Sequence, residues 1–185
     1  MKKLILIALA FSIILSHAAP VFAVEKTSFP TATISSTVDE ASKTADMRVA
    51  KLKGYLEAKG SPMADDARHF ITEADRLGLD WKLVAAIAGN ESYFGQHVPY
   101  NSYNGWGWAV WTGMSYGADF NGWGHGITTV SEGLKYEYID DGLVTIEQIG
   151  HRYAADPFWS DKVKFFMDQI ETFEPDSVKL LTLAL

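Results

Sequence analysis

The feature that most constrains this chain is a short apolar segment that ends in a single carboxylate. Residues 83–91 read Leu-Val-Ala-Ala-Ile-Ala-Gly-Asn-Glu, and Val84, Ile87 and Glu91 recur at helical spacing, so the carboxylate shares a helix face with apolar side chains. A helix with almost no polar face must be covered by other elements. We therefore expect this helix at the centre of the fold, with Glu91 at its end.

The stretch that follows, residues 92–118, contains no Asp or Glu and eight aromatic side chains. These aromatic residues are Tyr93, Phe94, Tyr100, Tyr103, Trp106, Trp108, Trp111 and Tyr116. A lone carboxylate beside aromatic rings is poorly hydrated in its charged form, so its pKa should rise and it can stay protonated near neutral pH. A protonated carboxyl is what a general acid acting on a glycosidic oxygen requires. The alternative is a helix-end Glu held by hydrogen bonds beside an aromatic core.

The N-terminus has the pattern of an export signal. Lys2 and Lys3 precede an apolar run over residues 4–15, and small side chains follow up to Ala23. This order is typical of a secretory signal peptide, so we expect cleavage after Ala23 and a secreted, periplasmic or cell-wall-associated protein. The alternative is an uncleaved anchor. After cleavage no stable membrane insertion is expected, because no other segment is long and apolar enough.

The charge and cysteine content exclude several classes of protein. The chain has no cysteine, so lipid anchoring as a lipoprotein is excluded and the domain must rest on a hydrophobic core rather than on disulfides. Without residues 1–23 it carries 14 basic and 23 acidic residues, a net charge of −9. A nucleic-acid partner is not expected, because the basic footprint is absent. The acidity favours a partner bound by stacking and hydrogen bonds.

Helical patterns occupy the chain on both sides of the aromatic stretch. A first helix is predicted over residues 46–59, and Ser61-Pro62 predicts the start of a second helix that ends at Gly78. The inner face of that second helix comprises Ala67, Phe70, Ile71, Ala74 and Leu77. Asp80 is expected to cap the third helix, which carries Glu91. Residues 95–126 have no clear period and many glycines, which predicts irregular structure or short strands.

Three further helices are predicted after this region. Val130 and Leu134 indicate one that runs to about residue 140, and Thr145 with Gln148 resembles a capping box at the start of the next. Residues 156–157, Asp-Pro, predict the start of the last helix. Its inner side comprises Trp159, Val163, Phe166, Met167 and Ile170.

These patterns predict a mainly α protein with a single helical domain and an aromatic, glycine-rich region in its middle. We assign residues 1–23 to a signal peptide and residues 24–45, which are rich in Ser, Thr and Ala, to a flexible linker. The helical domain is predicted over residues 46–175. Residues 176–185 form a C-terminal tail.

Several of these segments resemble the lysozyme-like superfamily. The apolar helix with Glu-Ser-Tyr-Phe at 91–94 is similar to the catalytic helix of soluble lytic transglycosylases and bacterial glucosaminidases, in which a Glu-Ser-x-Phe glutamate is the general acid. Residues 104–108 (Asn-Gly-Trp-Gly-Trp), 123–127 (Trp-x-x-Gly-Ile) and 133–134 (Gly-Leu) resemble the glucosaminidase-like branch, whose domains are described as mannosyl-glycoprotein endo-β-N-acetylglucosaminidase-like. The resemblance spans residues 64–170.

The resemblance implies a lysozyme-like fold and cleavage of the β-1,4 links between N-acetylmuramic acid and N-acetylglucosamine in peptidoglycan, with Glu91 as the general acid. The chain departs from lytic transglycosylases in lacking their Gly-Leu-Met-Gln and Ala-Tyr-Asn-Ala-Gly motifs. The resemblance therefore does not fix which bond is cleaved. Nor does it decide between hydrolysis and anhydro-forming transglycosylation.

The side chains expected to bind the glycan come mainly from the aromatic stretch. The candidates are Ser92, Tyr103, Asn104, Trp106, Trp108, Trp123 and Tyr153. Trp106 and Trp108 alternate with glycines, which offer little packing of their own, so their rings are expected to be open to sugars. Core packing is the alternative for these aromatic residues, because Trp and Tyr bury large areas.

A second catalytic carboxylate is not expected. The first acid after the aromatic stretch is Asp119, and Glu132, Asp140 and Asp141 fall in predicted helices or at their ends, where solvated charge is the usual role. A single-acid mechanism fits this spacing: Glu91 protonates the leaving oxygen and then acts as a base, while the N-acetyl or 6-hydroxyl group of the substrate assists.

No cofactor or metal is expected. His97, His125 and His151 are widely separated, and no cysteine is present to complete a metal site. Two non-catalytic alternatives remain, a glycan-binding module of the same fold that anchors the protein to the cell wall, and a structural exported domain whose aromatic residues are all core.

Overall fold

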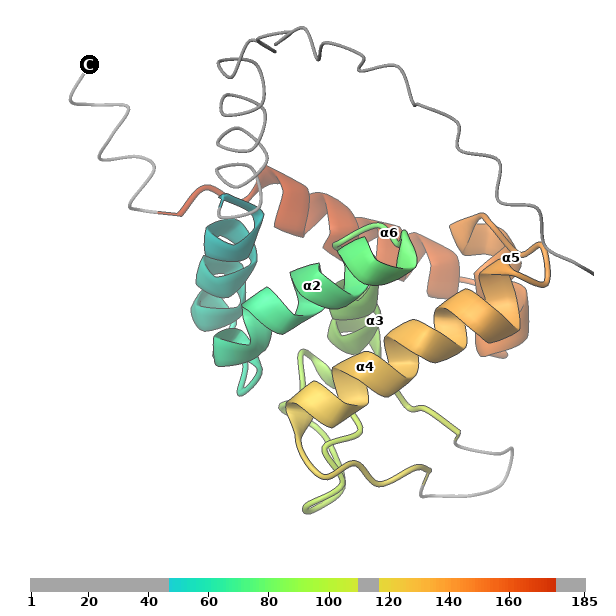
Figure 1. Ribbon diagram of the computed structural model, residues 1–185, viewed down its shortest axis with the longest axis horizontal. Helices are drawn as coiled ribbons and strands as arrows, with labels where there is room; N and C mark the ends of the chain where they lie inside the picture. Colours follow the sequence, from blue (N-terminus) through green and yellow to red (C-terminus); the bar gives the residue numbers. More distant parts are fainter. Residues whose placement is uncertain (1–46, 110–116, 176–185) are drawn as a thin grey trace, which may run out of the picture.

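The computed structural model describes residues 47–109 and 117–175. Within these ranges the regular structure is helical and no β-strand occurs, so the mainly α prediction is confirmed (Figure 1). The short strands allowed for in the aromatic region are absent from its described part. The predicted signal peptide, linker and C-terminal tail lie outside the described residues, as do Trp111 and Tyr116.

The first predicted helix is observed and covers residues 47–58, whereas the second predicted helix begins later than expected. A 3-10 turn, η1 (Ala64–Asp66), then leads into α2 (Ala67–Leu77). The hydroxyl of Ser61 accepts a hydrogen bond from the Met63 N–H and donates one to the Phe94 carbonyl, so it fixes a turn against the loop after Glu91. It therefore does not cap α2.

The inner face of α2 is the one predicted. Its five apolar residues, Ala67, Phe70, Ile71, Ala74 and Leu77, are all buried. Gly78 follows with a φ of 68°, a left-handed conformation that glycine adopts without steric cost, and it ends the helix as expected.

Helix α3 (Leu83–Ser92) lies at the centre of the molecule, as its apolar composition predicted. Residues 83–89 are all buried. Figure 1 shows α3 in the middle of the molecule, where it packs extensively on α6 (Trp159–Thr172) and less extensively on α4 (Trp123–Gly133). The prediction that Asp80 caps α3 was wrong: the residue before the helix is Lys82, which makes no side-chain capping bond. Asp80 instead accepts a hydrogen bond from the Lys82 N–H in the turn before the helix.

Helix α4 begins at Trp123, inside the region 95–126 that was predicted to be irregular. This part of the prediction was wrong because Gly124 and Gly126 look like helix breakers in sequence. In the fold, Gly126 is a contact point: a Cβ there would lie 2.6 Å from the Trp106 ring and 2.9 Å from the Phe120 ring. The helix continues as the π-helix η2 (Leu134–Ile139).

Of the last two helices, the first begins where the sequence predicted and the second begins slightly later. Thr145 and Gln148 form the predicted capping box at the start of α5 (Ile146–Tyr153). Helix α6 begins at Trp159, two residues after the Asp-Pro pair, because the Asp156 carboxylate holds the Phe158 N–H in a turn before the helix.

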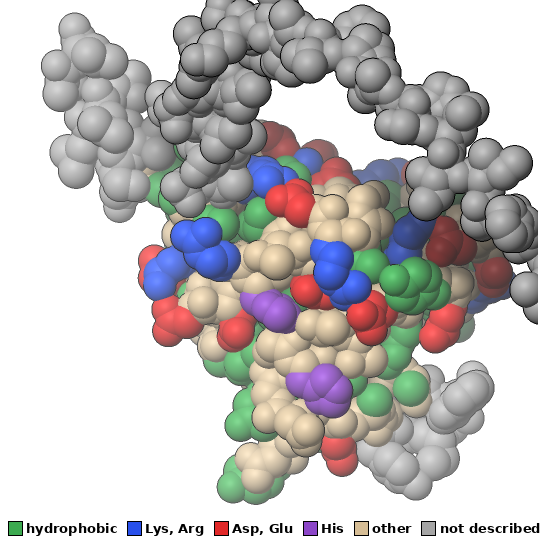
Figure 2. Space-filling view, in the orientation of Figure 1, with side chains coloured by type: hydrophobic (Ala, Val, Ile, Leu, Met, Phe, Trp, Pro, Cys, Tyr) green, Lys and Arg blue, Asp and Glu red, His purple; other side chains and the backbone are tan. Residues whose placement is uncertain are grey.

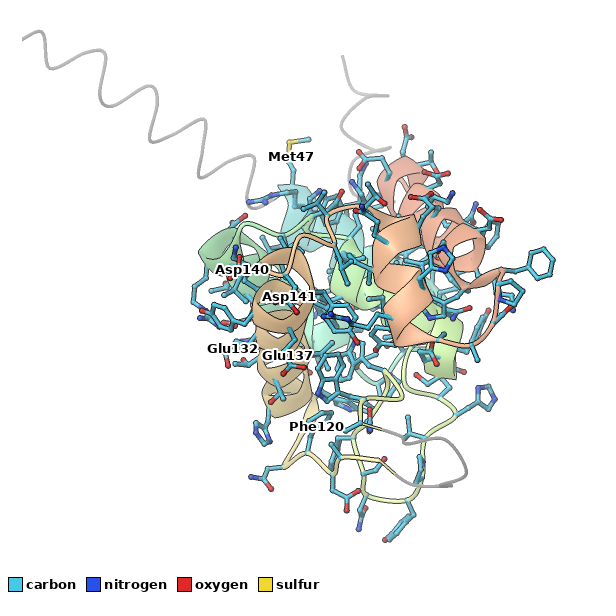
Figure 3. The ribbon with its side chains drawn as sticks, turned by 90° about the vertical axis from the view of Figure 1, so that its right-hand side faces the viewer. Met47, Phe120, Glu132, Glu137, Asp140 and Asp141 are labelled. Carbon is cyan, nitrogen blue, oxygen red and sulfur yellow. The ribbon has the colours of Figure 1, made fainter. Side chains whose placement is uncertain are left out.

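The acids of α4 and η2 have the solvated role that was expected. Figure 3 shows Glu132, Glu137, Asp140 and Asp141 along these two elements. Glu132 pairs with Arg76, Asp140 with Lys135, and Asp141 with Arg152. On the face seen in Figure 2, basic and acidic side chains are interspersed. The described helices include none with the length and apolar character needed to span a membrane.

The close approach at Gly126 predicts that replacing this glycine by alanine destabilises the protein, although the same change in an exposed helix position usually stabilises it. Gly126→Ala should lower the free energy of unfolding by about 1–3 kcal/mol, because the methyl group forces the Trp106 and Phe120 rings apart. Gly124→Ala on the same helix is the control: its Cβ would meet nothing closer than 3.8 Å, so stability should rise by roughly 0.5–1 kcal/mol. Urea unfolding measures both, and equal stabilities would contradict this account of the packing.

Candidate functional site

Glu91 lies where the central helix reaches the surface. It occupies the last turn of α3, where the residue as a whole is exposed although residues 83–89 are buried. Its carboxyl end lies against Trp159 and Asn90, so protein atoms replace part of its hydration. The chain leaves the helix abruptly, because Tyr93 and Phe94 both take left-handed conformations, with φ of 50° and 60°. This turn directs the aromatic loop across the end of α3 and leaves the carboxyl group of Glu91 beside it.

One oxygen of the Glu91 carboxyl accepts two hydrogen bonds. Trp159 Nε1 donates to Oε1 at 2.7 Å, and Asn90 Nδ2 donates to the same atom at 3.0 Å. Trp159 is the first residue of α6 and is 1 % exposed, so its indole N–H is a buried donor aimed at a carboxylate. Hydrogen bonds to ionised groups are stronger than those between neutral groups, which favours a fixed carboxyl orientation.

The pKa of Glu91 is raised above its ordinary value. The main cause is loss of hydration as neighbouring protein atoms surround the carboxyl group, and the nearby charge of Asp156 adds to it. The hydrogen bonds from Trp159 and Asn90 and the charge of Lys162 act in the opposite direction without cancelling it. The shift has the direction expected from the sequence, but the ring that touches the carboxyl group comes from α6 rather than from the aromatic loop.

A chain of aromatic contacts connects Trp159 back to α3. The Trp159 ring stacks on Tyr153, with centroids 4.8 Å apart. The hydroxyl of Tyr153 donates to the Trp106 carbonyl at 2.7 Å, and Trp106 Nε1 donates to the Val84 carbonyl at 2.9 Å. Burial raises the pKa of Tyr153 well above its ordinary value, so its hydroxyl remains a donor. A series of contacts through Trp159, Tyr153 and Trp106 therefore connects Glu91 to Val84 on the same helix.

A pocket of about 200 Å³ opens beside the carboxyl group. Its walls are formed by Glu91, Ser92, His97, Pro99, Ser102, Asn104, Gly107, Gly117, Ala118 and Asp119. The pocket therefore places Asp119, an exposed side chain, in the same hollow as Glu91. Of the described residues that line it, these two acids are the ones that carry a formal charge.

Two of the predicted glycan-binding residues form the frame of the pocket. The Ser92 hydroxyl donates to the Gly105 carbonyl at 2.7 Å and accepts the Gly95 N–H at 2.8 Å. The Asn104 amide donates to the carbonyls of Trp108 and Ala118 at 2.9 and 3.0 Å. Both side chains are nearly buried, and these bonds hold the pocket wall together.

The prediction that Trp106 offers its ring to a sugar was wrong. Trp106 is 0 % exposed, because the glycines beside it let the chain fold its ring into the core against Phe70, Phe120 and Trp123. Trp108 is half-buried against Gly133 of α4.

The remaining aromatic candidates lie at different depths. Trp123 is half-buried under Gly95, and Tyr103 packs edge-on against it while remaining 36 % exposed. Tyr153 is half-buried and stacks on Trp159. Besides Tyr103, the exposed rings in the described part of the aromatic stretch are Tyr93, at 43 % exposed, and Tyr100, at 93 %. In this described part the exposed rings are therefore those of tyrosines, whereas the sequence predicted exposed tryptophans.

Backbone strain is concentrated in the same loop. Among the described residues, the non-glycine positions with positive φ are Tyr93, Phe94, Asn101, Tyr103 and Ala109. All of them fall in the stretch that surrounds the pocket. Such conformations persist only where surrounding contacts enforce them, and they gather at binding and catalytic sites.

Sequence reasoning did not predict the three residues that lie next to the Glu91 carboxyl group. Asn90 and Trp159 bind the Glu91 carboxyl, and Gly107 lies beside its second oxygen. The inner-face pattern of the last helix included Trp159, but no sequence pattern indicates that its N–H reaches residue 91.

Comparisons with known proteins add no relative: no protein-family model matches the chain, and no curated protein sequence matches it. In the part of the chain that the structure describes, no group of three or more His, Cys, Asp or Glu side chains is placed to hold a metal ion.

The buried position of Trp106 predicts a structural role that an exposed aromatic residue would not have. Trp106→Ala should lower the free energy of unfolding by about 3–5 kcal/mol, because it empties a large core volume and removes the donor to Val84. Tyr100→Ala in the same loop should change it by no more than about 0.5 kcal/mol. Urea unfolding of both variants checks this, and a small loss for Trp106→Ala would restore the exposed-platform interpretation.

Proposed function

We propose that this protein is an exported peptidoglycan-cleaving glycosidase or lytic transglycosylase that acts on β-1,4 links between N-acetylmuramic acid and N-acetylglucosamine. Glu91 is its general acid and base. The observation that carries the proposal is a carboxyl group with a raised pKa, held by a buried indole N–H at the edge of a pocket. The resemblance of the Glu-Ser-Tyr-Phe helix end to lysozyme-like enzymes supports it.

The geometry suits acid catalysis followed by base catalysis. A raised pKa increases the fraction of Glu91 that is protonated at any given pH, and the protonated form can deliver its proton to the glycosidic oxygen as the bond to the anomeric carbon breaks. The resulting carboxylate is stabilised by Trp159 and Asn90 and can then remove a proton from the attacking water or from the 6-hydroxyl of the sugar.

The surroundings of the pocket suit an uncharged sugar. Residues 92–118, which supply most of its wall, contain no Asp, Glu, Lys or Arg. The exposed rings of Tyr93, Tyr100 and Tyr103 are the candidates for stacking on sugar faces. The partner proposed is peptidoglycan or a related glycan that contains N-acetylglucosamine, reached after export by the N-terminal signal.

Removing the acid should abolish cleavage without unfolding the protein. Glu91→Gln keeps the acceptor for Trp159 but has no proton to give, so turnover of purified peptidoglycan should fall by about 10²–10⁴-fold. Mass spectrometry of the products measures this and identifies the reaction, since 1,6-anhydro ends mean transglycosylation and reducing ends mean hydrolysis. Wild-type turnover in the folded variant would refute the assignment.

Stability against pH provides the folding control for this variant. Because the pKa of Glu91 is raised in the folded state, the native protein binds its proton more tightly than the unfolded chain does. The stability that this tighter proton binding contributes is fully present below the ordinary pKa of a glutamate, about 4.3. It is lost as the pH rises through the raised pKa of Glu91 in the folded protein. Gln does not titrate, so Glu91→Gln should be at least as stable as the wild type at neutral pH.

A non-catalytic glycan-binding module would retain its affinity in this variant and show no cleavage in either protein.

Asp119 tests the number of carboxylates that the reaction needs. It lines the same pocket as Glu91 but is exposed, so we expect Asp119→Asn to keep its rate within a few-fold of the wild type. A nucleophile or charge-stabilising partner would instead make this variant nearly as inactive as Glu91→Gln, because residues that act as one unit are not additive. Near-complete loss in a folded Asp119→Asn protein would establish a two-carboxylate mechanism.

A further inference from the structure

We propose that Trp159 is a positioning residue that confines the proton of Glu91 to a single oxygen, Oε2, and that Gly107 keeps this oxygen open to the pocket. This inference deepens the proposed function, on which its catalytic part rests. It assigns a role to a side chain that lies 68 positions from Glu91 in the sequence.

The two oxygens of the Glu91 carboxyl have different surroundings. Oε1 accepts the N–H groups of Trp159 and Asn90, neither of which can act as an acceptor in that position. A proton on Oε1 would therefore face two donors at close range. The protonated form of Glu91 is thus expected to have Oε1 as its carbonyl oxygen and Oε2 as its hydroxyl oxygen.

The open side of Oε2 is created by a glycine. A Cβ at position 107 would lie 3.2 Å from Oε2, closer than most side-chain contacts allow. Gly107 also has a φ of 61°, which disfavours any other residue there. Both Gly107 and Glu91 line the pocket, and the hydrogen bonds that Glu91 accepts among the described residues go to Oε1, so we infer that Oε2 is the oxygen on the side where a ligand would sit.

Proton transfer from this arrangement leaves the charge where the protein can stabilise it. The Oε2–H bond breaks, its electron pair stays on the carboxylate, and the proton bonds to the glycosidic oxygen as the bond from that oxygen to the anomeric carbon breaks. The carboxylate formed is delocalised over both oxygens and is held at Oε1 by the two N–H donors. The leaving oxygen takes the electron pair of the broken bond and departs as a neutral hydroxyl group. The positive charge left at the anomeric carbon is taken up by the N-acetyl group or the 6-hydroxyl group of the substrate or by water, as in the proposed function.

The position of Trp159 is fixed independently of Glu91. Its ring is buried, stacks on Tyr153 and belongs to the first turn of α6. A ring held in this way offers its N–H in one direction only, so the orientation of the carboxyl group follows from the packing of α6 on α3.

Other titratable groups around Glu91 must be considered in any test that follows its titration. Lys162 and Asp156 act on Glu91 through space, and the Lys162 ammonium group is itself bonded to Asp156 at 2.6 Å. The charge of Glu91 also acts on the Tyr153 hydroxyl. His97 and Asp119 line the same pocket. The substitutions below leave all five groups in place.

The first test removes the indole N–H but keeps an aromatic ring. In Trp159→Phe the carboxylate loses a donor, so the titration midpoint of Glu91, followed by ¹³C NMR of Glu-labelled full-length protein and assigned with Glu91→Gln, should move to higher pH. The limb of the pH–rate profile on its alkaline side should move with it. On peptidoglycan, kcat should fall by about 10- to 100-fold while KM stays within about twofold.

A buried residue on the same helix provides the control for general damage. Val163 is 0 % exposed and lies one turn after Trp159, with no polar group to offer Glu91. Val163→Ala should lower the melting temperature without moving the Glu91 midpoint. An unchanged midpoint in folded Trp159→Phe, or an equal shift in Val163→Ala, would overturn the positioning role.

The second test addresses Oε2 with a matched pair of glycines. Gly107→Ala and Gly60→Ala place a methyl group at similar φ values of 61° and 69°, but position 60 has nothing within 4 Å. Gly107→Ala should raise the Glu91 midpoint and lower kcat by about 10²-fold, because the methyl group shields Oε2. Gly60→Ala should do neither. Equal effects in both variants would overturn the role of Gly107.

The NMR readout separates this inference from the proposed function. If the midpoints of Trp159→Phe and Gly107→Ala shift as expected but the wild type releases no product from peptidoglycan, the positioning role stands and the proposed function is refuted. If the wild type cleaves peptidoglycan and neither midpoint shifts, the proposed function stands and this inference is refuted.

Discussion

The burial of α3 over residues 83–89 is the constraint on which the rest of this structure depends. Because these side chains are buried, the surrounding elements must enclose this part of the helix, and its C-terminal turn presents a polar group to solvent. Glu91 is that group. Because α6 supplies both the largest contact with α3 and the indole that binds Glu91, the packing that stabilises the core also orients the carboxyl group. Stability and the geometry of the site are therefore coupled through one helix pair.

Sequence patterns predicted the helices well where their physical signals are local. The buried face of α2, its glycine terminus and the Thr145–Gln148 capping box all depend on residues within one or two turns of each other, and each was found. The start of α4 was missed because Gly124 and Gly126 carry no helical signal, and the role of Gly126 lies in its close contact with the rings of Trp106 and Phe120. For the same reason glycines beside Trp106 suggested an open ring, whereas they allow it to enter the core.

In the candidate site, too, the features that depend on neighbouring residues were predicted, whereas those that depend on contacts between distant residues were not. Glu91, and the upward direction of its pKa shift, follow from the apolar helix and the acid-free stretch after it. Trp159 could not be predicted, because its approach to Glu91 depends on how α6 packs across α3. The pocket brings Asp119 beside Glu91 although the whole aromatic stretch separates them in sequence. A linear distance between two acids is thus a poor guide to whether they share a site.

The amide of Asn104 has a consequence for how this site can diversify. It joins the carbonyls of Trp108 and Ala118, and the Ala118 N–H also bonds to the Trp108 carbonyl at 3.0 Å, so the chain passes through a clasp before and after residues 110–116. Ala118 lines the same pocket as Glu91, so the amide of Asn104 holds part of the pocket wall in place. The Glu91 carboxyl is held by a separate set of donors, Trp159 and Asn90. The shape of the pocket wall can therefore change in evolution while the orientation of the carboxyl group is kept.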